Sequence, residues 1–314
     1  MSETSAHIES ELTAPQGNFS LHRHGHPKEQ LRAWDNADIY LLEEVAQIVE
    51  TKDVNRVLIV NDGFGALSIA LRKHTPDIII DSAQSRRALK ANLSANDYPV
   101  DEINTSTSFE MKWESPKETY DLVIMKLPKS HAQLDDQLHR IKHFIGADTI
   151  FIAGAMAKRI QRATVELFEH HFEGAQCSLA RKRARLIRVS APSKCASGGS
   201  PKLSSCTVSP ELAKVTCDLE LKSVPGTFAH GKLDLGTRAL LEVLELPSHV
   251  ETILDYGCGN GVLGIVAGLR HRDAHVTFVD DAAAAMVSTR LNVAQHFDSE
   301  RALSTALLEQ DSLA

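Results

Sequence analysis

Several hallmarks of common protein classes are missing from this sequence. No apolar run approaches the roughly 18 residues that a membrane-spanning helix needs, and the opening MSETSAHIES lacks the basic and apolar regions of a secretory signal. The five cysteines are odd in number and form no Cys-x-x-Cys pair. A disulfide framework or a zinc site is therefore not expected, and a reducing cytoplasm is favoured. The net charge of −7 excludes a protein that coats nucleic acid with its whole surface, but it allows a local basic patch.

The length of 314 residues suits two domains, and a content of 43% hydrophobic and 24% charged residues is typical of a soluble globular protein.

Two segments of the chain contain the same motifs in the same order. An apolar strand run, Val57–Val60 in the first and Thr252–Tyr256 in the second, leads into a glycine-rich turn and then a helical pattern. We superimpose Gly63-Phe64-Gly65 on Gly257-Cys258-Gly259 to align the two turns.

The match extends to both sides of these turns. Downstream, a second apolar strand ends in an acid, Asp81 or Asp280, and an asparagine, Asn92 or Asn292, follows 11 or 12 residues later. Upstream, an amphipathic segment precedes each first strand. We interpret this pattern as an internal duplication, because four matched elements occur in the same order. Strands alternating with helices predict an α/β fold with two tandem Rossmann-like domains, each built on a parallel doubly wound sheet.

The two copies differ in length. The first runs to a last predicted strand at 184–190, and residues 191–206 then have the Ser, Gly and Pro content of a linker. A short β-hairpin is expected within residues 215–231. Adding the 46 residues between Asp81 and Leu127 of the fourth-strand turn to Asp280 gives position 326, beyond Ala314. We therefore expect the second domain to be truncated. The predicted divisions are an N-terminal domain at 1–190, a linker and hairpin at 191–225, and the first part of the second domain at 226–314.

The glycine-rich turn of the second copy suggests a ligand, because glycine lets backbone approach a bound molecule at the carboxyl edge of a sheet. Residues 259–264 match the dinucleotide fingerprint Gly-x-Gly-x-x-Gly, which is a weak signal alone. Counted from the end of the strand, the pattern is instead Gly-x-Gly-x-Gly at 257–261, with Asp255 two residues earlier. S-adenosylmethionine is cationic and has no pyrophosphate, so this carboxylate favours it over NAD. Asp280 would accept hydrogen bonds from the ribose of either cofactor.

At these motifs the sequence resembles the bacterial ribosomal RNA guanine-N2 methyltransferases. The resemblance rests on GTFAHGKLDLGTRALLEVL, LDYGCGNGVLG and FVDDAAAAMVSTRLNV, and it spans residue 31 to the C-terminus. The first half, with VLIVNDGFGALSIAL and DLVIMKLPKSHAQLDDQL, is most similar to the large-subunit methyltransferase G family, with the small-subunit methyltransferase C family as near relative. The resemblance implies two class I methyltransferase domains, of which the first is cofactor-free. It also implies S-adenosylmethionine as cofactor and ribosomal RNA as partner. We expect a cytoplasmic protein without metal or membrane contact; a monomer is favoured, and the oligomeric state is left open.

The resemblance also implies which residues bind the cofactor. These are Asp255, Gly257, Gly259 and Gly261 of the turn, Asp280 at the ribose, Phe228 and Asp234 of the preceding loop, and Asp311 near the adenine. For Asp311 the alternative is an ordinary frayed terminal turn.

One family motif has no match here. In the family, an Asn-Pro-Pro-Phe turn after the fourth strand orients the exocyclic amine of a flipped guanine, and its aromatic ring stacks on the base. Residues 1–314 contain no such sequence. We therefore assign no catalytic residue, and we expect the 314-residue chain to be inactive.

The first copy is predicted to bind no cofactor. Our superposition places Asn61 at the acid position and Leu67 at the last glycine, where its side chain would project into the cofactor space. Its fourth-strand turn, 126–129, has neither an amide acceptor nor an aromatic ring. Asp81 is then interpreted as structural.

Basic residues concentrate near the end of the first copy. Eight of them lie between residues 158 and 188 against three acids, which gives +5 within a chain of −7. Such a run indicates either an RNA-contacting face or an ordinary solvated surface, and the family resemblance favours RNA. The predicted RNA-binding residues are Lys158, Arg159, Arg181, Lys182, Arg183 and Arg185, with Lys126 and Lys129 as an extension.

Two other features are interpreted as structural. His22, His24 and His26 alternate on one face of a predicted strand, but no further ligands lie nearby, so we assign no metal. Cys258 is interpreted as a small residue in a tight turn rather than a nucleophile.

Three functions remain open from the residues. The leading hypothesis is S-adenosylmethionine-dependent methylation of guanine N2 in large-subunit (23S) ribosomal RNA. The second is a non-catalytic protein that binds RNA or S-adenosylmethionine. The third is a nicotinamide-dependent oxidoreductase.

Overall fold

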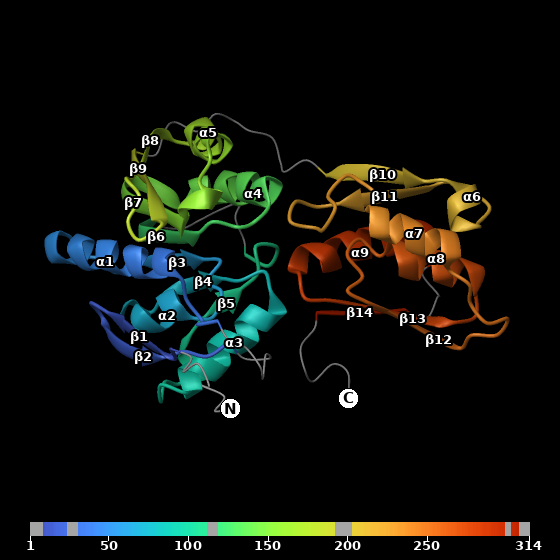
Figure 1. The fold of residues 1–314 in the computed structure, drawn as a ribbon, viewed down its shortest axis with the longest axis horizontal. Coiled ribbons are helices and arrows are strands. Elements are labelled where there is room, and N and C mark those ends of the chain that lie inside the picture. Colours follow the sequence, from blue (N-terminus) through green and yellow to red (C-terminus); the bar gives the residue numbers. More distant parts are fainter. Residues whose placement is uncertain (1–8, 24–30, 112–118, 192–202, 299–302, 308–314) are drawn as a thin grey trace, which may run out of the picture. The chain divides into compact units, whose positions relative to one another are not determined.

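The computed structural model describes residues 9–23, 31–111, 119–191, 203–298 and 303–307 (Figure 1). The chain folds into two compact units that divide at Gly198, and we call them the N-terminal unit and the C-terminal unit. No helix among the described residues is long and apolar enough to cross a membrane.

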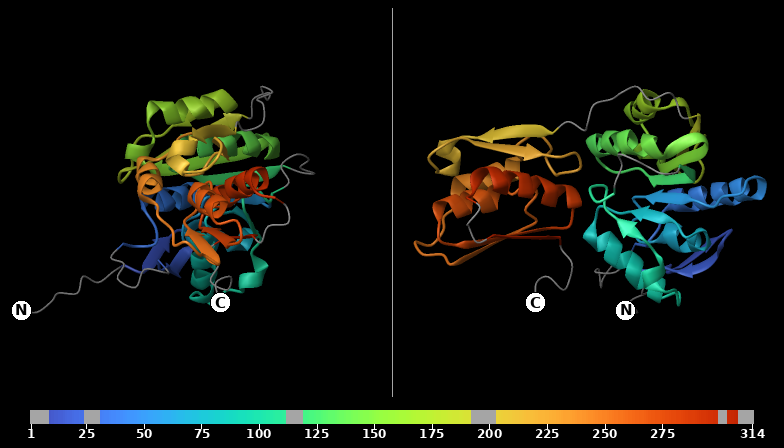
Figure 2. Two further views of the ribbon diagram at one scale, coloured as in Figure 1. Left: turned by 90° about the vertical axis from the view of Figure 1, so that its right-hand side faces the viewer. Right: turned by 180° about the vertical axis from the view of Figure 1, so that it is seen from behind.

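A seven-stranded mixed sheet forms the middle layer of the N-terminal unit (Figures 1 and 2). Its strand order is β5-β4-β3-β6-β7-β9-β8, in which the first five strands are parallel and β9 is antiparallel to both neighbours. A separate antiparallel ribbon joins β1 and β2. The bounds are Glu11–Ala14 (β1), Gly17–Ser20 (β2), Val57–Val60 (β3), Asp77–Ile79 (β4), Thr105–Ser106 (β5), Tyr120–Lys126 (β6), Ile145–Met156 (β7), Glu173–Cys177 (β8) and Ala184–Ala191 (β9).

Helices cover both faces of this sheet. Because successive strand residues point to opposite faces, Val57 and Ile59 pack in the cluster that holds α1 and α2, whereas Leu58 and Val60 pack in the cluster that holds α4 and α5. All four are buried, which explains why β3 has a continuous apolar run. The helices are α1 (Asn36–Thr51), α2 (Ala66–Ala70), α3 (Ala83–Ser94), α4 (His131–Ile141) and α5 (Arg162–His171).

The C-terminal unit contains a three-stranded parallel sheet in the order β12-β13-β14. Its strands are Thr252–Tyr256 (β12), His275–Asp280 (β13) and Leu303–Leu307 (β14), and its helices are α6 (Pro210–Ala213), α7 (Leu235–Val243), α8 (Val262–Arg270) and α9 (Ala283–His296). The hairpin expected within residues 215–231 is wrong in its pairing. Strand β11 (Leu219–Ser223) pairs instead with β10 (Ser204–Val208), whose first residues fall in the predicted linker. The alternating polarity of Ser204–Val208 suits a strand with one buried face.

The two glycine-rich turns correspond with an alignment that differs by two residues from the sequence superposition. The N–H of Asn61 donates to the Ile79 carbonyl (2.9 Å), and the N–H of Gly257 donates to the Val279 carbonyl (2.8 Å), at the same step of each sheet. Asn61 thus occupies the position of Gly257, and it shares its positive φ (64° and 77°). The proposed match of Asn61 with Asp255 is therefore wrong.

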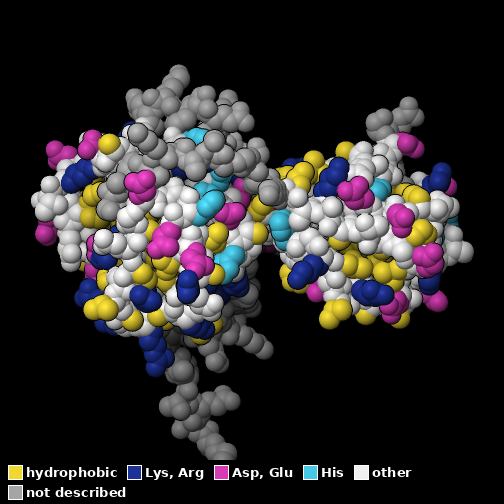
Figure 3. All heavy atoms as spheres, turned by 90° about the horizontal axis from the view of Figure 1, so that it is seen from above, with side chains coloured by type: hydrophobic (Ala, Val, Ile, Leu, Met, Phe, Trp, Pro, Cys, Tyr) yellow, Lys and Arg dark blue, Asp and Glu magenta, His cyan; other side chains and the backbone are white. Residues whose placement is uncertain are grey.

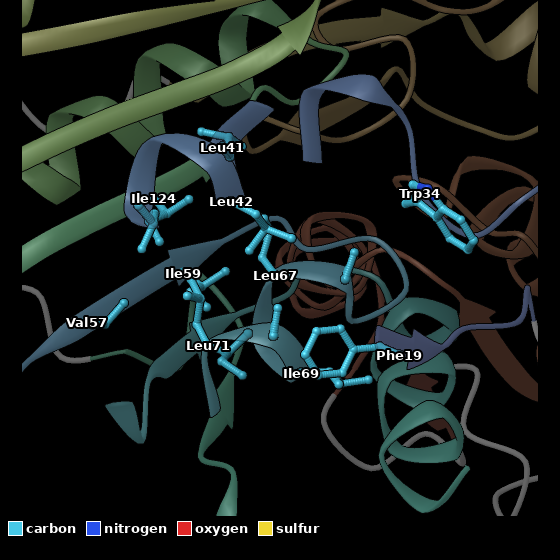
Figure 4. Packing of buried hydrophobic residues seen from close by; sticks show 14 of the residues in the cluster. Phe19, Trp34, Leu41, Leu42, Val57, Ile59, Leu67, Ile69, Leu71 and Ile124 are labelled. Atoms are coloured by element: carbon cyan, nitrogen blue, oxygen red, sulfur yellow. The ribbon is translucent and has the colours of Figure 1, made fainter. Parts of the chain in front are cut away.

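The helix after each turn begins at a left-handed glycine. Gly65 (φ 94°) caps α2 and Gly261 (φ 85°) caps α8. Leu67 therefore matches Leu263, not the last glycine. Its side chain does not project into ligand space but is fully buried in the core between α1 and the sheet (Figure 4). The superposition of Gly63 and Gly65 on Gly257 and Gly259 was wrong because the helix begins at a fixed distance from the end of the strand, whatever the position of the Gly-x-Gly pair.

An asparagine on α3 or α9 ties the glycine-rich turn to a neighbouring segment in each unit, which is the stretch after β2 in the N-terminal unit and β11 in the C-terminal unit. Asn92 Nδ2 donates to the carbonyls of Phe64 (2.8 Å) and His22 (3.0 Å), and its Oδ1 accepts from the His22 N–H (2.9 Å). Asn292 repeats this arrangement with Asn260 (2.8 Å) and both backbone groups of Lys222 (2.8 and 2.7 Å). Both asparagine side chains are fully buried, so each satisfies backbone groups that water cannot reach.

The sheet of the C-terminal unit exposes one side of β12. Leu254 and Tyr256 are 55% and 62% exposed, whereas their counterparts Leu58 and Val60 are fully buried. Among the described residues, β12 pairs only with β13. Hydrophobic side chains are also visible on the C-terminal unit in the space-filling view (Figure 3, right).

Candidate functional site

The loop between β12 and α8 is the centre of the candidate site. Gly257, Gly259 and Gly261 all have positive φ (77°, 57° and 85°), a conformation that a side chain disfavours. The N–H of Gly259 donates to Asp280 Oδ2 at the end of β13 (2.9 Å), and Asp280 Oδ1 accepts from the Ala282 N–H (2.9 Å). One carboxylate, that of Asp280, therefore holds both the glycine loop, through Gly259, and the start of α9, through its N-cap Ala282.

Asp255 joins the strand to the helix. Its Oδ2 accepts from the N–H of Gly264 in α8 (2.8 Å). A Cβ on Gly264 would lie 2.4 Å from the Phe278 ring and 2.9 Å from Asp255, so only glycine allows this approach. Burial raises the pKa of Asp255, and the nearby Asp280 carboxylate adds to the rise, while the Gly264 N–H opposes it. A cationic ligand beside these two carboxylates would relieve their repulsion.

One pocket collects five of the eight predicted cofactor residues. Phe228, Asp234, Asp255, Gly257 and Gly259 line it together with Ala229, Lys232, Leu233, Thr237, Cys258, Asn260, Val262 and Leu263. Gly261 lies beside the pocket as the α8 cap, and Asp280 supports its wall through Gly259. Asp311 lies outside the described residues.

The loop before α7 forms the outer wall of this pocket. Asp234 caps α7 by accepting from the N–H groups of Gly236 (2.8 Å) and Thr237 (3.1 Å). Phe228 is 73% exposed, which is unusual for a phenylalanine and leaves its ring available for contact. The pocket residues Lys232 and Thr237 were missed by sequence reasoning, because no motif distinguishes them.

Cys258 is an unreactive part of the loop. Its thiol is buried, with Sγ 3.4 Å from Thr289 Oγ1 and 4.0 Å from Met286 Sδ. Burial raises the pKa of Cys258 to about 12. The thiolate that a nucleophile needs is therefore scarce at neutral pH.

The thiol chemistry can be tested within this chain, because Cys217 is exposed and serves as an internal control. We expect iodoacetamide to alkylate Cys217 readily in the folded protein and to leave Cys258 unmodified until denaturant is added. Peptide mass spectrometry at matched times measures both. Alkylation of Cys258 at the rate of Cys217 would show that the loop opens and that the thiol is accessible.

The N-terminal unit fills the corresponding region with its own polar side chains. Ile80, buried in the core, takes the place of Asp280, and Ile59 takes the place of Asp255. The Asn61 amide exchanges hydrogen bonds with the Gln137 amide (2.8 and 2.9 Å), and Gln137 also donates to Asp81 Oδ2 (3.1 Å). The N-terminal unit thus has no counterpart of Asp255 or Asp280, and the polar groups at this sheet edge are satisfied within the unit.

Lys126 closes the same edge as a buried cation. Its Nζ lies 2.8 Å from Asp35 Oδ1 and 2.8 Å from Asp38 Oδ1, the two residues that form the capping box of α1. Burial opposes the charge of Lys126, but the carboxylates of Asp38 and Asp35 raise its pKa overall. Both carboxylates already hold the ammonium group of Lys126, and the extension of the RNA patch to this residue stays a prediction. Lys129 is exposed.

The six predicted RNA-binding residues gather around the turn between β8 and β9 and a 3₁₀ turn at Ala157–Arg159. Two of them have internal partners. Arg181 pairs with Glu43 (2.7 Å), and Arg185 Nε donates to the Ser178 carbonyl (2.8 Å). Lys158, Lys182 and Arg183 are exposed.

The histidine motif does not form a metal centre in the described part of the chain. His22 Nε2 lies 3.1 Å from Ser20 Oγ, and no group of three or more His, Cys, Asp or Glu side chains among the described residues could hold a metal ion. His24 and His26 lie outside the described residues.

Comparison with known proteins decides the family. Residues 9–194 match the RLMG N-terminal domain, and residues 218–312 match the methyltransferase small domain. Ribosomal RNA large subunit methyltransferase G of Streptomyces griseus is 36% identical over 281 residues, covering 88% of this chain and 72% of the relative. The protein of that name from Aliivibrio fischeri is 32% identical, covering 94% and 74%. The chain belongs to the ribosomal RNA large subunit methyltransferase G family. The resemblance inferred from the motifs is thereby confirmed.

A solved structure supports the fold. The T. thermophilus 16S rRNA N2 G1207 methyltransferase, solved in complex with AdoMet and guanosine, superimposes with a TM-score of 0.68 at 19% identity, covering 94% of this chain and 73% of its own. This likeness confirms the predicted α/β methyltransferase fold.

The ion pair between Lys126 and Asp38 in the N-terminal unit can be tested by substitution. Replacing Lys126 with Met leaves Asp38, only 5% exposed, without its cation, and we expect a loss of about 3–5 kcal/mol in the free energy of unfolding. Lys129→Met is the matched control and should change little. Both tryptophans of the sequence, Trp34 and Trp113, precede Gly198, so tryptophan fluorescence in urea follows this unit in the whole chain.

The same variant has a predictable pH dependence. Burial raises the pKa of Asp38 to about 6 although Lys126 lowers it. The folded state therefore binds the Asp38 proton more tightly than the unfolded state does. Protonation of Asp38 thus stabilises the fold at low pH, and this contribution is lost as pH rises through the folded-state pKa. Without Lys126 that pKa rises further. The loss in Lys126→Met should be smaller near about pH 5 than near about pH 8; an equal loss at both values would contradict a buried charged Asp38.

Proposed function

We propose that the C-terminal unit binds S-adenosylmethionine and that this chain carries the cofactor half of an enzyme that methylates guanine N2 in large-subunit (23S) ribosomal RNA. The observation that carries the proposal is the glycine loop between two carboxylates, Asp255 and Asp280, with Phe228 and Asp234 on the facing wall. The family supplies the reaction class and the RNA. Work on ribosomal RNA is consistent with a cytoplasmic protein.

The residues of this pocket suit the chemical groups of the cofactor. S-adenosylmethionine supplies an electrophilic methyl group on a cationic sulfonium. Asp280 already orients the loop through Gly259 and offers carboxylate oxygens at the strand end, where ribose hydroxyls can donate. Asp255 and Asp234 add negative charge that attracts the cationic end. The left-handed glycines remove side chains that would block the backbone from the ligand.

The 314-residue chain should bind the cofactor without transferring its methyl group. The solved relative contains guanosine beside AdoMet, which supports guanine as the base. Residues 1–314 contain no Asn-Pro-Pro-Phe sequence to orient the amine of that base. The pocket residues thus account for cofactor binding, and no residue among 1–314 is assigned to the transfer step.

The N-terminal unit acts as a cofactor-free copy of the same fold that contacts RNA. Matching turns, matching left-handed glycines and the two asparagine contacts support an internal duplication. We assign residues 1–190 to this copy, 191–225 to the linker and ribbon, and 226–314 to the cofactor domain. The basic residues around the β8–β9 turn, Lys158, Arg159, Arg181, Lys182, Arg183 and Arg185, form its RNA-facing set.

Cofactor binding is tested by calorimetry on the whole chain. We expect S-adenosylmethionine to bind and NAD not to bind. Asp280→Asn removes the charge at the ribose end of the pocket and should weaken S-adenosylmethionine by about tenfold or more. Asp273→Asn makes the same charge change at an exposed site before β13 and should have no effect. Binding of NAD in place of S-adenosylmethionine would establish the oxidoreductase alternative.

Methyl transfer is tested with labelled S-adenosylmethionine and deproteinised 23S ribosomal RNA. We expect no label in RNA from the 314-residue chain, and label from the Streptomyces griseus relative assayed in parallel as the positive control. Label in guanine from the 314-residue chain would contradict the assignment of the missing motif as essential.

A further inference from the structure

The turn between β8 and β9 has an unfavourable backbone. Arg181 and Ala184 exchange two backbone hydrogen bonds (both 2.8 Å), so Lys182 and Arg183 are the two central residues of a tight hairpin turn. Both have positive φ, 47° and 65°. A two-residue turn of this kind strongly favours Asn-Gly, because side chains with a Cβ disfavour the left-handed region.

The tip of this hairpin is held from two sides. Asn36 Nδ2, at the start of α1, donates to the Lys182 carbonyl (2.7 Å), and the N–H of Ala157 donates to the Arg183 carbonyl (2.7 Å). The two carbonyls that such a turn directs outward are thus bound to the body of the unit. The side chains of Lys182 and Arg183 are exposed and do not take part in these contacts.

The charges around the tip divide into two groups. Arg181 and Arg188 are paired with Glu43 and Glu44, Arg188 through two bonds of 2.6 Å. Arg185 forms no ion pair, but its Nε donates to the Ser178 carbonyl (2.8 Å). Among the described residues, no carboxylate lies within ion-pair distance of the other four cations, which are Lys158, Arg159, Lys182 and Arg183. The Ala157–Arg183 hydrogen bond brings these four together, because Lys158 and Arg159 directly follow Ala157.

We propose that the hairpin tip of Lys182 and Arg183, with Lys158 and Arg159 beside it, is the phosphate-binding point of the N-terminal unit for ribosomal RNA. The inference rests on the proposed RNA contact of this unit and narrows it from six residues to these four. An unpaired, rigidly held cluster of cations suits a phosphate backbone, which is read by charge and position. Two basic residues in a strained turn lower the stability of the unit, and a ligand bound by their side chains accounts for this cost.

The strain makes stability and RNA binding separable in one variant. Replacing Lys182 with Asn and Arg183 with Gly installs the pair that this turn favours and removes both charges. We expect the melting transition of the N-terminal unit, followed by tryptophan fluorescence of the whole chain, to rise by about 2–4 °C. Affinity for 23S ribosomal RNA transcribed in vitro should fall by about tenfold, and the slope of log affinity against log salt should decrease by about 1–2.

Three variants control the result. Lys182→Arg with Arg183→Lys keeps both charges and should retain affinity and salt slope. Lys73→Asn with Lys90→Asn removes two exposed charges elsewhere in the unit and should change neither quantity much. Arg188→Gln removes a charge that is already paired with Glu44, so it should lower stability and leave the salt slope unchanged.

The outcomes are distinct. Higher stability with weaker, less salt-dependent RNA binding supports the assignment. Unchanged RNA affinity in the Asn-Gly variant overturns it, and so does a fall in stability, which would show that the turn carries no strain. If the unaltered chain itself does not bind the RNA, the RNA contact of the proposed function fails, whereas S-adenosylmethionine binding by calorimetry tests the cofactor site independently.

Discussion

One buried asparagine in each unit holds the turn on which the rest of the fold depends. Asn92 and Asn292 each bind the backbone of the glycine-rich turn and, through two further bonds, a neighbouring segment: the residue His22 after β2, or Lys222 in β11. Without this side chain, the backbone groups of the turn and the ribbon would be buried without partners. The turn must also end in a left-handed glycine before the helix can begin. These requirements concern the scaffold, so they apply equally to both units.

The polar groups at the sheet edge, unlike the scaffold contacts, differ between the two units. In the C-terminal unit, Asp255 and Asp280 place two carboxylates at the sheet edge and bind only backbone N–H groups there. In the N-terminal unit, both positions are isoleucine, and the polar groups at the edge bind one another. Burial penalises an unpaired polar group, so a site without its ligand has to be closed by side chains of the protein. Lys126 and Asp38 do this with opposite charges, and the cation offsets part of the cost of burying the acid.

The sequence predicted the order of elements and the glycine-rich turn because both depend on local patterns. The buried run Val57–Val60 and the Gly-x-Gly-x-Gly turn are visible without knowledge of any distant contact. The alignment of the two copies was not predicted correctly, because matching glycine to glycine ignored the distance from strand to helix. Leu67 was therefore misplaced by two residues. The pairing of Lys126 with Asp35 and Asp38 spans about 90 positions and leaves no local signal. The same holds for the division of the basic run into paired and unpaired residues.

The exposed side of β12 shows how the same strand pattern depends on its neighbours. The side chains of Leu58 and Val60 in β3 pack in the cluster that holds α4, and β3 itself pairs with β6. Leu254 and Tyr256 repeat their positions, but in the described residues no element covers them. Burying such a side chain contributes about 1.5–3 kcal/mol, so the covering layer stabilises the sheet of the N-terminal unit at both positions. The loop that lines the pocket does not depend on this face, because Asp255, Asp280 and Asn292 hold it through short contacts to its backbone. The geometry of the loop is therefore set by polar contacts within residues 219–292.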